Sequence, residues 1–150
     1  MKNTKIFALL FAVVMLFVAC EPSPGGKKDE NAIAKEWHIE NWNNQTPEFD
    51  VYVSFNEDGT FDLYQQVYTL NYVHYSGTYT AVDTILSGFY ADGKPWECSY
   101  NYSVSADGSQ LTLNSQETIP VTSVYVNEVI PEAVKSEATR VEAIDVVPFL

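Results

Sequence analysis

The chain has 150 residues, of which 20 are acidic and eight are basic, and its formal net charge is −12. From Ala32 onward four bases stand against 17 acids, so this part carries −13. Such a charge disfavours nucleic acid and anionic lipid headgroups as partners. The remaining length, about 120 residues, suits one domain with one core. The two cysteines, Cys20 and Cys98, exclude a disulfide framework.

The first 20 residues have the pattern of a targeting signal. Lys2 and Lys5 precede an apolar run over 6–18, which is shorter than the roughly 20 residues of a membrane-spanning helix. The run ends in Phe17-Val18-Ala19-Cys20, which resembles the bacterial lipobox, where the cysteine is lipidated and begins the mature chain. We therefore expect a lipoprotein signal peptide over 1–19 and an outer-membrane lipoprotein anchored through acylated Cys20. The alternative is ordinary secretion with cleavage elsewhere.

Residues 20–31 contain proline, glycine and charged side chains without periodicity, which predicts a flexible tether. Within it, Lys27-Lys28-Asp29-Glu30 resembles a short export signal that sends lipoproteins of one group of Gram-negative bacteria to the cell surface. An ordinary charged tether has the same composition. The periplasmic and the cell-surface face therefore both stay open.

Residues 49–67 predict the first β-hairpin. Positions 49, 51, 53 and 55 are apolar and alternate with other residues, as in a strand with one buried face. The loop Glu57-Asp58-Gly59 joins this strand to the next one. It sets two cross-strand pairs on the inner face, Phe55 with Phe61 and Val53 with Leu63. Tyr52 pairs with Tyr64 on the opposite face, where both are expected to be exposed.

Two further Asp-Gly turns, at 92–93 and 107–108, predict two more hairpins. Across the first, the predicted inward pairs are Ile85 with Tyr100, Ser87 with Cys98 and Phe89 with Trp96. Leu86 and Tyr90 depart from this pattern. Across the second, the predicted pairs are Val104 with Leu111 and Tyr102 with Leu113. Cys98 is accordingly expected to pack as a small hydrophobe and not to act as a nucleophile.

Eight strands are predicted, over 35–42, 49–55, 60–67, 75–81, 84–91, 95–105, 110–115 and 118–128. Since turns are short and one face is apolar, we predict an all-β fold, an eight-stranded antiparallel up-and-down barrel whose closure removes exposed edges. A two-sheet sandwich is the alternative. Ile130, Val134, Ala138 and Val141 share one helical stripe, which predicts a C-terminal helix over 131–144. The domain then covers 32–150.

Three stretches carry a resemblance to a family: FDVYVSFNEDGTFDLYQ, YSGTYTAVDTILSGFYADGKPWECSYNYSVS and SQLTLNS. They resemble the small lipocalin-like lipoprotein domains of gut-type Gram-negative bacteria, over roughly residues 33–130. The resemblance implies a lipocalin-like, calycin-type barrel and an extracytoplasmic role, but no particular activity. Trp37 stands where lipocalins have the Trp of their Gly-x-Trp motif, while Lys35 occupies the Gly position.

The sequence has no motif for catalysis or metal binding. His38 and His74 do not have metal-ligand spacing, and no Gly-rich phosphate loop or GxSxG elbow is present. The loop Asn56-Glu57-Asp58-Gly59 is not an EF-hand, which needs oxygen ligands over twelve residues. We therefore predict no enzymatic activity, no metal and no cofactor.

The meander sends the loops 43–48, 68–74, 91–95 and 116–117 to one end of the barrel, opposite the N-terminal entry. Aromatic residues gather there, and Tyr and Trp combine flat apolar area with a polar group, which suits sugar rings or planar ligands. Inward-facing polar side chains could supply hydrogen bonds. The predicted ligand-binding residues are Trp42, Gln65, Tyr68, Tyr72, His74, Tyr75, Ser87, Trp96, Tyr100 and Ser115, with Tyr90 beside them.

The sequence thus predicts a lipid-anchored cell-envelope barrel that binds a small or oligomeric ligand, a glycan or an apolar molecule, at this end. The alternative is a barrel filled by its own side chains, acting as a structural or interaction module in an envelope protein complex. An inhibitor of a secreted hydrolase is a third option, by fold analogy. The oligomeric state is open. Asp83-Thr84-Ile85 also resembles the O-glycosylation site of periplasmic proteins in the same bacteria.

Overall fold

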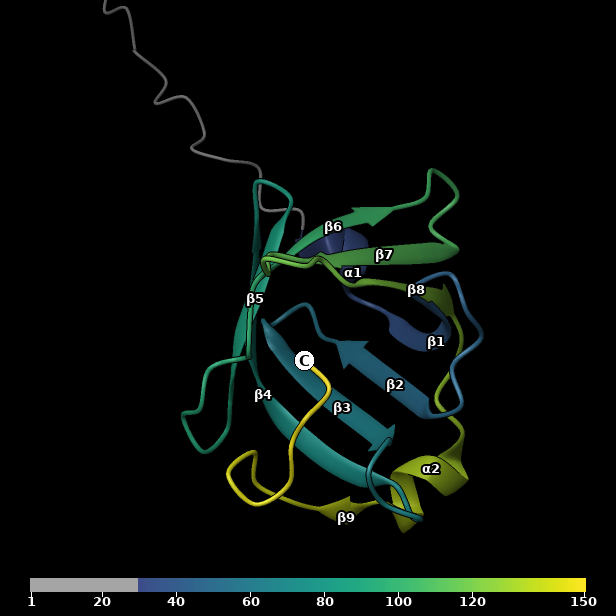
Figure 1. Cartoon of the computed structure of the whole chain (residues 1–150), viewed down its shortest axis with the longest axis vertical. Helices are drawn as coiled ribbons and strands as arrows, with labels where there is room; N and C mark the ends of the chain where they lie inside the picture. The colour runs from purple at the N-terminus through teal and green to yellow at the C-terminus, as the bar shows by residue number, and fades with distance from the viewer. Residues whose placement is uncertain (1–29) are drawn as a thin grey trace, which may run out of the picture.

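The computed structural model describes residues 30–150. The predicted signal peptide, the lipidation site Cys20 and the tether up to residue 29 lie outside the described residues. Eight antiparallel strands form a ring in which each strand pairs with the next along the chain and β1 pairs with β8 (Figure 1). The predicted up-and-down barrel is confirmed, and the sandwich is excluded because the eight strands close on themselves.

The barrel strands are β1 (Glu36–Trp42), β2 (Asp50–Phe55), β3 (Thr60–Gln66), β4 (Val73–Val82), β5 (Ile85–Tyr90), β6 (Tyr100–Val104), β7 (Gln110–Ser115) and β8 (Thr122–Asn127). Helix α1 (Glu30–Ile33) precedes them, and α2 (Glu132–Glu137) and β9 (Thr139–Arg140) follow. Helix α1 thus begins within the predicted tether. The predicted helix over 131–144 is too long: Ala138 is already extended (φ −65°, ψ 131°), and β9 then pairs in parallel with β4.

Two of the three predicted hairpin registers are confirmed. Strands β2 and β3 pair Phe55 with Phe61 and Val53 with Leu63, and strands β6 and β7 pair Val104 with Leu111 and Tyr102 with Leu113. In the connecting turns Gly59 and Gly108 have φ values of +81° and +69°. The Asp-Gly signal works here because glycine takes the left-handed conformation without steric cost.

Strand β5 is offset by one residue from its predicted register. Ile85 pairs with Asn101 and Leu86 pairs with Tyr100, so Leu86 and Tyr90 are buried while Ser87 and Phe89 face outward. The predicted inward orientation of Ile85, Ser87 and Phe89 is wrong. The offset of β5 has a physical reason in the space that Trp96 needs. A Cβ on Gly88 would lie 2.6 Å from the Trp96 ring. The residue of β5 that faces this ring therefore has to be glycine, which puts Leu86, Gly88 and Tyr90 on the inner face.

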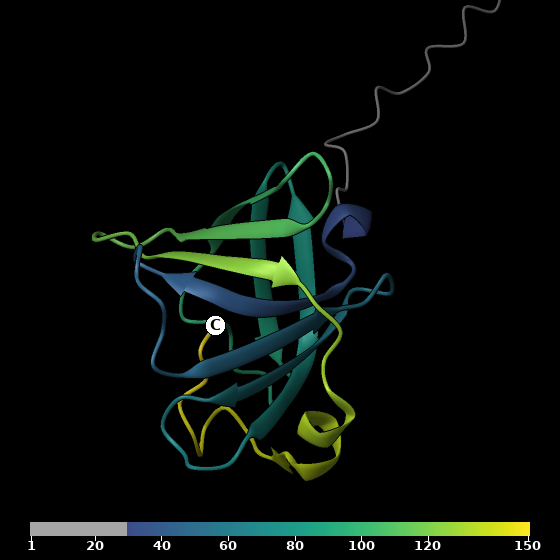
Figure 2. The ribbon, with the colours of Figure 1, turned by 90° about the vertical axis from the view of Figure 1, so that its right-hand side faces the viewer.

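The barrel is filled mainly by aromatic and aliphatic side chains, and each end is covered. At one end Ile33 of α1 is fully buried, and its carbonyl accepts a hydrogen bond of 2.8 Å from Trp37 Nε1. The other end is the barrel mouth, where β1, β3, β5 and β7 finish. Residues 141–150, the C-terminal segment, lead from β9 into this mouth, and Leu150 is buried there (Figures 1 and 2).

The outer surface of β2 and β3 is covered by α2. Tyr52 and Tyr64 form the predicted cross-strand pair, but they are only 6 % and 8 % exposed. They pack against Ile130 and Val134, so the prediction of an exposed pair is wrong. Ile130 and Val134 belong to the apolar stripe from which the C-terminal helix was predicted, and this stripe buries both tyrosines.

The turn between β4 and β5 contains two non-glycine residues in the left-handed region, Asp83 (φ 51°) and Thr84 (φ 65°). Val82 pairs directly with Ile85, and a two-residue hairpin loop of this type requires positive φ at both central positions. A β-branched residue tolerates this conformation poorly. The turn is exposed, as the O-glycosylation prediction requires; the modification itself stays a prediction.

Replacing Thr84 with glycine is therefore expected to raise the free energy of unfolding by about 1 kcal/mol, because glycine relieves the strain. Thr80→Gly is the matched control. Thr80 lies in regular β4, where glycine should lower stability by about the same amount. Urea denaturation of both variants checks the prediction, and two changes of the same sign would contradict it.

Candidate binding site at the barrel mouth

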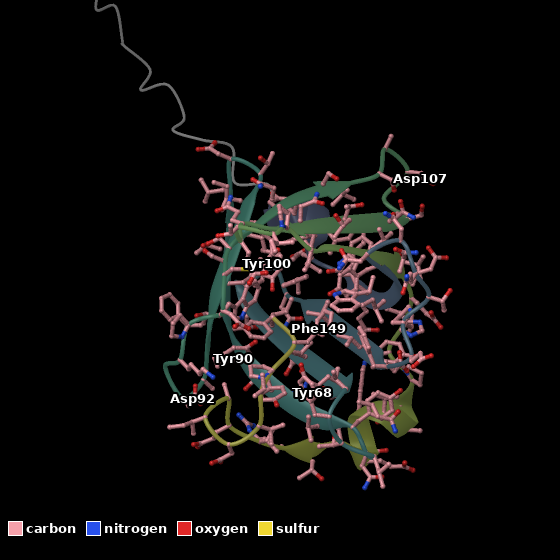
Figure 3. All side chains as sticks on the ribbon, in the orientation of Figure 1. Tyr68, Tyr90, Asp92, Tyr100, Asp107 and Phe149 are labelled. Atoms are coloured by element: carbon pink, nitrogen blue, oxygen red, sulfur yellow. The ribbon has the colours of Figure 1, made fainter. Side chains whose placement is uncertain are left out.

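A pocket of about 160 Å³ lies at the barrel mouth, between the ends of the strands and the C-terminal segment. Figure 3 shows Tyr68, Tyr100 and Phe149 from three parts of the chain around this opening. The pocket is lined by Trp42, Tyr68, Glu97, Cys98, Tyr100, Ser115, Glu117, Val121, Ser123, Val147, Pro148 and Phe149. It brings together four of the predicted ligand-binding residues: Trp42, Tyr68, Tyr100 and Ser115.

The size of this pocket limits what it can hold. A cavity of roughly 150 Å³ accommodates a benzene molecule, so 160 Å³ corresponds to one six-membered ring with small substituents. Longer molecules would have to extend into solvent or move the C-terminal segment.

The aromatic wall of the pocket continues from β1 to the C-terminal segment. The rings of Trp42 and Phe49 meet edge to face at 5.5 Å, and Phe49 lies 5.4 Å from Phe149. Such edge and tilted contacts are favourable aromatic geometries. Phe49 is not among the predicted site residues, although it directly precedes β2 and shares the inward parity of Val51.

The inner wall of the pocket carries hydroxyl groups. Tyr100, Ser115 and Ser123 are all buried, and Ser115 Oγ accepts a hydrogen bond of 2.8 Å from the Val121 amide. Burial raises the pKa of the Tyr100 phenol, with the neighbouring Cys98 adding to the effect. Tyr100 therefore stays un-ionised at neutral pH and presents a neutral hydroxyl group.

The rim of the pocket is acidic, because Glu97 and Glu117 line it. The domain as a whole also carries a large negative charge. A carboxylate or phosphate ligand would be repelled at this opening. On charge alone, the pocket therefore favours neutral ligands over anionic ones.

Three other predicted residues face inward but contact the C-terminal segment or the core. Gln65 is fully buried and forms hydrogen bonds with the backbone of residues 147 and 149. Tyr75 donates a hydrogen bond of 3.0 Å to the Val146 carbonyl. Trp96 packs in the core and borders a second hollow, of about 490 Å³, which Pro148 and Leu150 also line.

Tyr72, His74 and Ser87 lie outside the barrel and do not reach the mouth pocket. Tyr72 donates a hydrogen bond to the Asp50 carboxylate. His74 Nε2 lies 2.8 Å from Asp62 Oδ1, and its ring stacks on Tyr64 at 4.5 Å. Ser87 Oγ lies 3.2 Å from Thr80 Oγ1 on the outer face. The sequence placed Tyr72 and His74 at the correct end but could not tell that they face outward, and Ser87 lies in the half of β5 nearer the turn at the opposite end.

The second histidine also belongs to the outer surface. His38 Nε2 lies 2.6 Å from Asp50 and Nδ1 lies 2.8 Å from Glu128, while its ring stacks on Tyr52 at 4.2 Å. These contacts tie β1 and β2 to the chain that leads into α2. Within residues 30–150, no group of three or more His, Cys, Asp or Glu side chains has an arrangement that could hold a metal ion.

A larger hollow, of about 600 Å³, lies between β4, the loop after β5 and residues 140–145. Arg140 Nη2 donates a hydrogen bond of 3.1 Å to Ser76 Oγ within it, and Asp92 accepts from the Ile144 amide. Acidic side chains surround the single arginine, and the hydroxyls of Tyr75 and Tyr90 are already bonded to the C-terminal segment. Because both tyrosine hydroxyls are occupied in this way and the arginine lies among carboxylates, the mouth pocket is the better candidate for a neutral ligand.

The C-terminal segment is the part of the candidate site that the sequence did not predict. Its last five residues, Val146-Val147-Pro148-Phe149-Leu150, are all apolar. A run of this kind beyond the final helix is a signal of burial. Its position in the mouth depends on contacts with residues more than 70 positions earlier, which no local pattern reveals.

Cys98 provides a probe of the pocket. Burial raises the pKa of its thiol above the ordinary value, and only the thiolate reacts readily. In a chain carrying Cys20→Ser, alkylation of Cys98 at pH 7 is expected to be slower than that of free cysteine, and to accelerate as the pH rises. Timed alkylation with iodoacetamide, followed by mass spectrometry, measures this. Alkylation at the rate of free cysteine would contradict the burial.

These features define an up-and-down β-barrel of eight strands with an aromatic mouth that is partly covered by its own C-terminal segment. Comparisons with protein-family models, with curated proteins and with solved structures give no match. Membership of a lipocalin-like lipoprotein family therefore stays a prediction. Neither helix described in residues 30–150 is long and apolar enough to cross a membrane.

Proposed function

We propose that this protein is a binding barrel that takes a compact, neutral, mainly apolar molecule with one hydroxyl or N–H group into the mouth pocket. The observation that carries the proposal is the composition of one pocket, in which the aromatic rings of Trp42 and Phe149 occur together with the buried residues Tyr100 and Ser115, each of which carries a hydroxyl group. Apolar walls with a few placed polar groups are typical of small-molecule sites.

The chemistry of the pocket supports a ring-shaped ligand. Its volume of about 160 Å³ suits one ring, and aromatic walls favour stacked or edge contacts with a flat molecule. The acidic rim formed by Glu97 and Glu117 disfavours fatty acids and other anions. Of the ligand classes considered from the sequence, a small apolar ring fits these properties better than an oligomeric glycan.

We also propose that the barrel is attached to the outer membrane through acylated Cys20. Support comes from the apolar run over 6–18 and the lipobox-like Phe17-Val18-Ala19-Cys20. The described domain begins with α1 at the barrel end opposite the mouth. A lipid-linked chain entering at that end would leave the mouth facing away from the membrane.

A thermal-shift panel tests the ligand proposal. The compounds are p-cresol and indole as neutral rings, methyl β-glucoside as a sugar, and octanoate as an anionic apolar chain. We expect p-cresol or indole to raise the melting temperature of the protein and octanoate to have no effect, because octanoate meets the acidic rim. If none of the four compounds raises the melting temperature, the proposal is wrong.

A pair of variants locates the binding. Trp42 lines the mouth pocket and is partly exposed, so Trp42→Ala should weaken ligand binding about tenfold, the loss of roughly 1.4 kcal/mol of contact. Phe89→Ala is the matched control, because Phe89 is an exposed aromatic residue on the outer side of β5. Equal weakening by both substitutions would place the ligand elsewhere.

A second candidate function is a structural or interaction module of an envelope complex. The observation that favours it is the covering of both barrel ends, by α1 and by the C-terminal segment. This function predicts no response to the ligand panel and a protein partner captured by cross-linking on intact cells. A positive panel with the Trp42 dependence described above would decide against it.

A further inference from the structure

The barrel holds the backbone of the C-terminal segment with an amide side chain. Gln65 Nε2 donates a hydrogen bond of 2.9 Å to the Val147 carbonyl, and Gln65 Oε1 accepts one of 2.7 Å from the Phe149 amide. Both polar ends of the side chain are thus paired with main-chain groups two residues apart. A neighbouring β-strand would offer the same donor and acceptor pair.

Two tyrosines extend this recognition along the segment. Tyr75 in β4 donates its hydroxyl hydrogen to the Val146 carbonyl, and Tyr90 in β5 donates to the Leu150 carbonyl. Together with Gln65 they form hydrogen bonds with four backbone groups of residues 146–150: three carbonyl oxygens and one amide. None of these contacts depends on which side chains the segment carries, which is how proteins bind extended peptides.

The barrel also contains apolar sites for the side chains of the segment. Leu150 is buried in the core cluster, and Phe149 packs against Phe49. Val147 stays exposed at the opening, where it lines the mouth pocket. The segment is therefore recognised through its main chain and through the apolar side chains at its last two positions.

Gln65 is fully buried in β3 with the segment in place. Its amide nitrogen and its amide oxygen are both bonded to the main chain of the segment. Without an occupant in the mouth the amide would lose both partners, and water would have to replace them. Gln65 is therefore complementary to a bound main chain at this position.

The segment does not fill the mouth completely. The pocket of about 160 Å³ and the hollow of about 490 Å³ both border Val147 and Pro148. Apart from the two residues of β9, the chain after α2 forms no strand pairing with the barrel. The eight barrel strands close through their own pairings, so the segment can leave without breaking the ring.

We propose that the barrel mouth is a binding site for a peptide that is not strongly acidic and has the pattern apolar–Pro–aromatic–apolar, and that residues 147–150 are its resident ligand in the same chain. The site overlaps the small-molecule pocket but goes beyond it, since it recognises main chain through Gln65, Tyr75 and Tyr90. The acidic charge of the domain excludes strongly acidic peptides.

The test adds the peptide in trans to the full chain. A fluorescein-labelled peptide of sequence AIDVVPFL, which is residues 143–150, is titrated against the unaltered chain and against a Phe149→Ser/Leu150→Ser variant. The tethered segment competes at an effective concentration in the millimolar range. We therefore expect the variant to bind the peptide at least tenfold more tightly than the unaltered chain, by fluorescence anisotropy.

The control peptide carries serine at its last two positions and should not displace the labelled one. If the variant keeps its far-ultraviolet circular dichroism but binds AIDVVPFL no better than the unaltered chain does, the proposal is overturned. The small-ligand panel is independent of this result, because it uses the pocket with the segment in place. Failure of one proposal is therefore distinguishable from failure of the other.

A second measurement applies if the double variant does not fold. Amide hydrogen exchange on the unaltered chain compares Phe149, bonded to Gln65, with Leu63 in the centre of β3. A replaceable segment opens locally, so the Phe149 amide should exchange at least tenfold faster than the Leu63 amide. Equal rates with the same denaturant dependence would show that the segment opens only with the whole barrel, which overturns the proposal.

Discussion

Trp96→Ala is expected to lower the free energy of unfolding by about 3–5 kcal/mol, the range for removing a large aromatic side chain from a core. Trp96 is only 5 % exposed. Its ring lies 5.2 Å from Phe61 and 6.1 Å from Tyr100, in edge-to-face contacts. Alanine would leave a cavity between the walls of the barrel that rigid strands cannot close. Urea denaturation followed by circular dichroism measures the loss.

Phe89→Ala is the control for this substitution and tests the register of β5. Phe89 is 57 % exposed on the outer face, so its removal should change stability by less than about 0.5 kcal/mol. The register expected from the sequence would place Phe89 opposite Trp96 inside the barrel. A cost of several kcal/mol at both positions would support that register and contradict the offset in the structure.

The protein is expected to unfold at alkaline pH in a steep transition. Burial raises the pKa of Tyr75 to about 12 and shifts the pKa of Tyr90, Tyr100 and Tyr125 in the same direction. In the unfolded chain these phenols ionise near pH 10. A raised pKa in the folded state means that this stability is fully present below pH 10 and is lost as the pH rises toward and beyond 12.

Two signals recorded together check the alkaline transition. Tyrosinate absorbance at 295 nm reports ionisation, and far-ultraviolet circular dichroism reports the barrel. For the buried tyrosines the two signals should change together, because ionisation requires unfolding. Full ionisation of all ten tyrosines near pH 10 with unchanged circular dichroism would contradict their burial.

Local sequence signals predicted the barrel because turn chemistry and strand alternation act over a few residues. The Asp-Gly turns at 58–59 and 107–108 connect strands without irregularity, so the pairs Phe55–Phe61 and Val104–Leu111 followed directly. The Asp-Gly turn at 92–93 is followed by residues 95–99, which form only one bridge, between Phe89 and Pro95. This irregular stretch changes the register between β5 and β6. The Asp-Gly turn alone does not show that such a stretch follows it.

The parity of β5 was nevertheless present in the sequence. Leu86, Gly88 and Tyr90 alternate as buried positions, with Gly88 making room for Trp96. A glycine at the centre of an inward row weakens the apolar signal, so the row through Ile85 and Phe89 was the more apolar choice. An alternating pattern shows which row of residues is more apolar. It does not show that the Trp96 ring, several residues away in the sequence, needs the space beside Gly88.

The candidate site was only partly predictable for a related reason. Inward parity identified Gln65, Tyr100 and Ser115 correctly, since alternation is a local property. The covering of Tyr52 and Tyr64 by α2, and of Gln65 by residues 147 and 149, joins parts of the chain that are far apart in sequence. Such contacts require the three-dimensional path of the chain after β8.

Protection of Cys98 tests the central claim, that the mouth pocket binds a ring-sized ligand, most directly. Cys98 lines that pocket, and in a chain carrying Cys20→Ser it is the sole thiol. Saturating p-cresol or indole, whichever raises the melting temperature, is predicted to slow alkylation of Cys98 by at least fivefold. An unchanged alkylation rate in the presence of a bound, stabilising ligand would place the ligand outside the barrel mouth and contradict the claim.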